Sequence, residues 1–76
     1  MSITEGTVNM NITLRQAIVM RVKGKSEEEL REVITESVDG EEKALPGLGV
    51  LFENIWKNSD AALQTHMIEN LEKSLE

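Results

Sequence analysis

Few side chains in this 76-residue sequence are of the types that act in catalysis or bind metals, and none of them has the spacing of a known catalytic or metal-binding motif. His66 is the only histidine and there is no cysteine, so a transition-metal site lacks ligands. The spacing of the serines places none of them beside a histidine, which argues against nucleophilic catalysis. We therefore predict no catalytic residue, no metal ligand, no cofactor and no small-molecule substrate.

Two groups of carboxylates, Glu27–Glu29 and Glu41–Glu42, remain as candidates for acid–base chemistry or calcium binding. Calcium loops place oxygen ligands at alternate positions around a turning glycine, and neither group has that arrangement. The helix dipole explains Glu27–Glu29, because negative charge is favoured at the start of a helix. Glu41–Glu42 are expected in a solvated turn.

The segment Leu45–Gly49, with the sequence LPGLG, superficially resembles a glycine-containing anion cradle at a helix start. It lacks the lysine and the hydroxyl of a phosphate-binding loop, and it lacks the spacing of a dinucleotide fingerprint. We interpret Gly47 and Gly49 instead as positions where the backbone of another segment comes close, because glycine has no side chain.

The cationic side chains form the one cluster in the sequence that is suited to binding a ligand. Residues 7–26 carry a net charge of +4, whereas residues 27–76 carry −9, within a total of −6. Duplex binding depends on phosphate neutralisation, so the acidic total and the glutamates at 27–29 argue against nucleic acid. If nucleic acid were nevertheless the ligand, the binding residues would be Arg15, Arg21, Lys23, Lys25 and Arg31.

The first half of the chain predicts two helices after a flexible or extended lead-in at residues 1–12. Thr13 and Gln16 form a capping box, which favours a helix that ends near Gly24. A short alternating pattern at residues 8–13 keeps a hairpin over residues 7–22 open as the alternative. Ser26 and Glu29 form a second capping box, and the helix that follows ends near Gly40.

The second half predicts two more helices. Pro46 suits the first turn of a helix that continues to about residue 58, and Ser59 or Asp60 caps the last one. The apolar residues of the third helix share one face, which we expect to be the core, so that Phe52→Ala costs about 3–5 kcal/mol. These are Leu48, Leu51, Phe52, Ile55 and Trp56. Short loops predict near-antiparallel packing of consecutive helices.

The fold class predicted is therefore all-α. We expect a small bundle of about four short helices in a single domain over residues 13–76, with a possible short extended segment before it. A domain of this length can bury only a small core, which contributes a net stability of only about 3–5 kcal/mol. There is no signal-peptide pattern and no membrane-length apolar run, which predicts a small soluble intracellular protein.

Two segments resemble the I-type minor small, acid-soluble spore proteins of endospore-forming bacteria. Residues 40–56, GEEKALPGLGVLFENIW, resemble the signature block of that family, and residues 14–34, LRQAIVMRVKGKSEEELREVI, resemble its other block. One difference is that thirteen residues precede Leu14, whereas the family's chains start close to this block. The resemblance implies a protein of the dormant spore core, in the forespore cytoplasm, with no established chemical activity.

The function predicted is that of a minor, non-enzymatic spore-core protein whose molecular role and partner are undefined. The alternative is a small helical module that binds DNA through residues 15–31, or protein through the apolar face of the helix at 47–58. If four helices cannot bury that face, self-association would cover the remainder.

Overall fold

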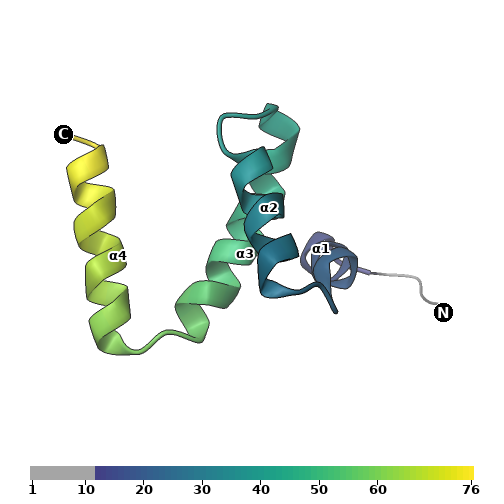
Figure 1. Cartoon of the computed structure of the whole chain (residues 1–76), viewed down its shortest axis with the longest axis horizontal. Coiled ribbons are helices and arrows are strands. Elements are labelled where there is room, and N and C mark those ends of the chain that lie inside the picture. Colours follow the sequence, from purple (N-terminus) through teal and green to yellow (C-terminus); the bar gives the residue numbers. More distant parts are fainter. Residues whose placement is uncertain (1–11) are drawn as a thin grey trace, which may run out of the picture.

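The computed structural model describes residues 12–76, and in this part of the chain every regular element is helical (Figure 1). This confirms the all-α class. The extended pattern proposed for the lead-in lies almost wholly outside the described residues. The elements are α1 (Leu14–Val22), α2 (Glu27–Ser37), a short 3-10 helix η1 (Glu42–Ala44), α3 (Leu45–Lys57) and α4 (Ala61–Ser74).

The first two helices begin at the capping boxes that the sequence predicts. The backbone N–H of Gln16 donates to the Thr13 hydroxyl at 3.1 Å, and the Thr13 N–H donates to the Gln16 side chain at 2.9 Å. Ser26 and Glu29 exchange the same pair of bonds, at 3.2 and 2.8 Å. Because these bonds satisfy N–H groups that a helix start leaves unpaired, they fix both boundaries. The hairpin alternative is wrong for residues 14–22.

Helix α3 is the central element, because both α1 and α2 pack against it (Figure 1). The one buried apolar side chain among residues 12–76 is Val50, at 7% exposure. Our expected core face is therefore only partly correct. Leu48, Leu51 and Trp56 are half-buried, but Phe52 is 47% exposed and Ile55 is 44% exposed. The reason is that α1 approaches α3 on the side of Val50 and Glu53, so the Phe52 side stays open.

The glycines of α3 also differ from expectation. A side-chain carbon placed at Gly47 or Gly49 would meet nothing within 4 Å. No backbone comes close at these positions, so close packing does not explain them. Pro46 does lie in the first turn of α3, as predicted.

Helix α4 follows α3 after three residues but does not pack along it (Figure 1). The chain is elongated, measuring 50 × 26 × 26 Å, and its radius of gyration is 15.9 Å. A compact domain of this length would have a radius of about 11 Å. The expectation that all consecutive helices lie as antiparallel neighbours is thus wrong for α4, and it is also wrong for α1 and α2, which each pack against α3 and not along one another. Within residues 12–76, no helix has the length and apolar character that crossing a membrane requires.

Candidate functional site: an apolar groove with a cationic edge

A groove of about 960 Å³ lies between α1, α2 and α3. We call it the α1–α3 groove. Each of the three helices contributes aliphatic side chains to its wall. They are Val19 and Val22 from α1, Leu30 and Ile34 from α2, and Leu51 and Ile55 from α3.

The turn between α1 and α2 sets the shape of this groove. Gly24 has a φ of +86°, a left-handed conformation that glycine adopts without steric cost. The chain can therefore reverse within four residues, and Ser26 starts α2 immediately afterwards. Because α1 and α2 are held apart at this turn while both contact α3, their apolar sides line a shared channel instead of closing on each other.

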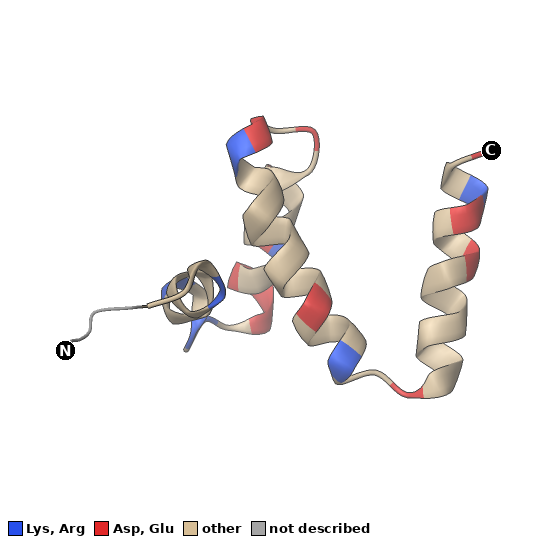
Figure 2. Ribbon diagram, turned by 180° about the vertical axis from the view of Figure 1, so that it is seen from behind, with Lys and Arg blue, Asp and Glu red and all other residues tan. Residues whose placement is uncertain are grey.

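Three of the five cations named as a possible nucleic-acid site lie at this groove. Lys23 and Lys25 flank the glycine of the turn, and Arg31 lies one turn into α2. Glu27 lies beside them, so the edge is cationic but not exclusively so. Figure 2 shows blue segments on and just after α1, and red segments at the start of α2. Arg21 does not line the groove. The structure thus gathers part of the predicted cluster.

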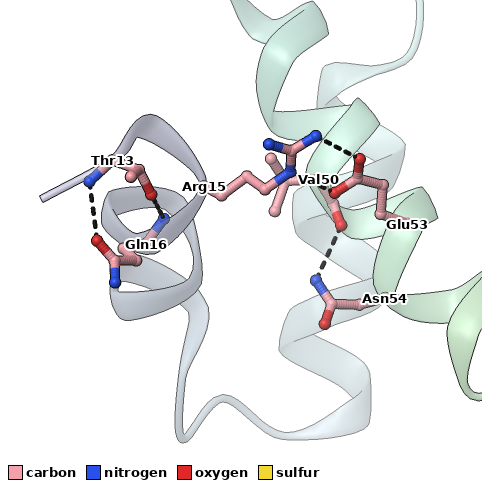
Figure 3. Close-up of polar contacts among 6 residues, drawn as sticks. All are labelled: Thr13, Arg15, Gln16, Val50, Glu53 and Asn54. Carbon is pink, nitrogen blue, oxygen red and sulfur yellow. Dashed lines mark hydrogen bonds and ion pairs between the residues drawn. The ribbon is translucent and has the colours of Figure 1, made fainter.

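Arg15 has a different role, because it joins α1 to α3 (Figure 3). Its Nε and Nη2 atoms donate to the two carboxylate oxygens of Glu53, each at 2.8 Å. Such a two-bond pair fixes orientation as well as distance. The hydrogen bond from Arg15 lowers the pKa of Glu53 from its usual value, and the same bond raises the pKa of Arg15. Sequence analysis missed this pair because the partners are 38 residues apart.

The other polar side chains lie apart from the groove and pair locally. His66 Nδ1 is 3.5 Å from Glu69 on the surface of α4. Glu41, for which the sequence suggested only a solvated turn, pairs with Lys43 at 3.1 Å. Within residues 12–76, no three histidine, aspartate or glutamate side chains converge as a metal site would require.

The groove therefore offers one kind of chemistry. Aliphatic walls bind apolar surface through the hydrophobic effect, and the cations at one end attract negative charge. A ligand that matches both features is an amphipathic segment with acidic residues at one end, which is the helix-in-groove mode of recognition.

Comparison with known proteins places the chain in a family. The family model for "Small, acid-soluble spore protein I" matches residues 12–75. A protein of that name from Bacillus cereus (strain G9842) is 49% identical over 67 residues, which cover 87% of this chain and 97% of the relative. Its namesake from Bacillus licheniformis is 48% identical over 67 residues, with 87% and 96% covered. No solved structure matches. The chain therefore belongs to the family of small, acid-soluble spore protein I, as the resemblance in its sequence predicted.

Proposed function

We propose that this spore protein is a non-enzymatic component of the spore core that acts by binding another protein in the α1–α3 groove. The observation that carries the proposal is the groove itself, which combines aliphatic walls from three helices with Lys23 and Lys25 at the α1–α2 turn and Arg31 one turn into α2. A surface of this kind suits an acidic amphipathic helix.

Three serine hydroxyls support a role without catalysis. Ser37 donates to the carbonyl of Val33 at 2.8 Å, and Ser59 donates to that of Ile55 at 2.6 Å. Ser74 does the same with Leu71 at 2.8 Å. The protons of these three serines are thus directed at main-chain carbonyls, whereas an activated nucleophile would donate to a base.

Location in the spore core is tested by fractionation of intact spores. Alkaline detergent removes the coats, and mechanical breakage followed by acid extraction then releases the contents of the core. We expect the protein only in the second extract, with a known coat protein as the control for the first. Recovery of the protein in the coat extract would contradict the proposed location.

Nucleic acid is the competing ligand, because the same three cations converge at the groove. Glu27, Glu28 and Glu29 at the adjoining helix start would repel phosphates, which is why we favour protein. The test is a titration of backbone amide signals with a short DNA duplex at low and moderate salt. We expect no shifts at moderate salt. Shifts that cluster at residues 15–31 and fade as salt rises would identify a nucleic-acid site instead.

A further inference from the structure

Helix α4 carries an apolar stripe that its own chain leaves mostly exposed, with only Met67 half-buried. Leu63, Met67, Leu71 and Leu75 recur every four residues, which places them on one helical face, and Ile68 lies alongside. Leu63 is 53% exposed and Leu71 is 52% exposed. A stripe of this width on a helix normally packs against another element.

The charges of α4 complement those of the groove. The segment from Asp60 to Glu76 has four acidic residues and one lysine, and three of the acids lie in its last eight residues: Glu69, Glu72 and Glu76. Figure 2 shows the red segments of α4 concentrated toward its C-terminal end. The partial negative charge of a helix C-terminus adds to them. This end therefore suits the groove end that bears Lys23 and Lys25.

We infer that the occupant of the α1–α3 groove is α4 of a second copy of the same chain. The stripe lies against the aliphatic walls, and the acidic end of α4 lies beside the cations of the α1–α2 turn. Two copies that exchange α4 helices form a symmetric dimer in which both grooves are filled. This inference rests on the proposed binding role and identifies the partner.

The connection between α3 and α4 favours a second copy over the chain's own groove. Asn58 Nδ2 donates to the Asn54 carbonyl at 2.8 Å, and Gln64 Nε2 donates across the connection to the Trp56 carbonyl at 2.9 Å. Asp60 caps α4 by accepting from the Leu63 N–H at 2.9 Å. Of these bonds, the one from Gln64 crosses the connection, and α4 stands apart from α1 and α2 (Figure 1). A return of α4 to its own groove would break the bond from Gln64.

Disulfide trapping tests the arrangement cleanly because the chain contains no cysteine. Val22→Cys places one thiol in the groove wall beside the turn, and Ser74→Cys places another three residues after Leu71, on the side of the stripe. The two variants are purified separately, mixed and oxidised in a glutathione buffer, so any bond between them joins two copies. We expect a heterodimer by mass spectrometry.

Lys73→Cys is the matched control, because its side chain lies about 100° around the helix from that of Ser74, away from the stripe. It should give little heterodimer with Val22→Cys. Equal yields from Ser74→Cys and Lys73→Cys would overturn the inference. A chain that carries both substitutions, Val22→Cys and Ser74→Cys, provides the second control. A disulfide that forms only within one copy of this double variant would also overturn the inference.

A mass measurement by sedimentation equilibrium provides the second test. We expect twice the monomer mass for the unmodified protein, loss of the dimer in Leu71→Asp, and its retention in Ala62→Asp, which alters the opposite face. The double variants Lys23→Glu/Lys25→Glu and Glu72→Lys/Glu76→Lys should each lose the dimer and regain it when mixed. A protein that is monomeric at every concentration overturns the inference, whereas the fractionation result for spores bears only on the proposed location.

Discussion

The unit formed by α1, α2 and α3 and the arm formed by α4 are both helical, but different interactions hold them. The three-helix unit has contacts between elements distant in sequence, namely the Arg15–Glu53 pair and the packing around Val50. The arm has a cap at Asp60 and one side-chain bond to Trp56. Isolated helices of fewer than about 12–15 residues are marginal in water. The 14 residues of α4 thus form a helix that needs a partner to be firmly folded.

The largest effect is expected in the three-helix unit, at its buried centre. Val50→Ala removes two buried methyl groups and should lower the free energy of unfolding by about 2 kcal/mol. Urea denaturation followed by circular dichroism measures this. Val38→Ala, at a side chain that is 54% exposed, is the control and should cost little. Equal losses in both variants would show that Val50 is not the centre of the unit.

A smaller effect is expected from the half-exposed aromatic ring on the far side of α3. Phe52 contacts Trp56, with 5.8 Å between ring centroids, but nearly half of its surface is in water. Phe52→Ala should therefore cost only about 1–1.5 kcal/mol, half the value for full burial. Thermal melts compare it with Val50→Ala. If Phe52→Ala lowered stability more than Val50→Ala does, the core would lie at the apolar face of Phe52, as the sequence predicted.

The arm should respond separately from the unit. Asp60→Ala removes the cap of α4 and should destabilise that helix by about 1 kcal/mol, whereas Asp60→Asn keeps an accepting oxygen and should cost much less. Amide hydrogen exchange, measured on dilute protein, should quicken in residues 61–74 of Asp60→Ala and stay unchanged in α1 to α3. Faster exchange throughout the chain would mean that unit and arm unfold together.

The smallest effect is a dependence of the stability of the three-helix unit on pH. Hydrogen bonds from Arg15 lower the pKa of Glu53, and those from Ser26 lower the pKa of Glu29, from an ordinary value of 4.5. Their contribution to stability is complete above pH 4.5 and is lost as the pH falls through the lowered values. Glu53 and Glu29 are both exposed, so solvent weakens their interactions with Arg15 and Ser26. The resulting loss of stability at low pH is therefore small.

Melting temperatures measured from neutral pH to below 4.5 should therefore fall only slightly. Glu53→Gln, which cannot ionise, should reduce that slope. An unchanged slope in this variant would show that Glu53 contributes nothing to it.

The sequence predicted those features that depend on neighbouring residues. The capping boxes at Thr13 and Ser26, the proline in the first turn of α3 and the family resemblance all rest on short motifs, and each is confirmed. Features that depend on distant residues were missed. Periodicity identifies an apolar face at Phe52 but not which helix covers it, and the pairing of Arg15 with Glu53 has no local signal.

The groove was predicted only in part. Its cations were named from composition, but their place beside an aliphatic channel depends on how the turn at Gly24 directs α2. A sequence pattern does not contain that direction. The same holds for α4, whose apolar stripe was evident while its separation from the rest of the chain was not.

The open space around Gly47 and Gly49 has a consequence for motion. Glycine within a helix gives up more backbone freedom on folding than alanine does, at a cost of about 0.5–1 kcal/mol for each residue. Because no neighbouring segment occupies the space at these positions, no close packing offsets that cost. The first half of α3 should therefore unwind more often than its second half. Since α3 provides one wall of the groove, such unwinding near Leu51 would loosen that wall and give a partner helix a way in and out.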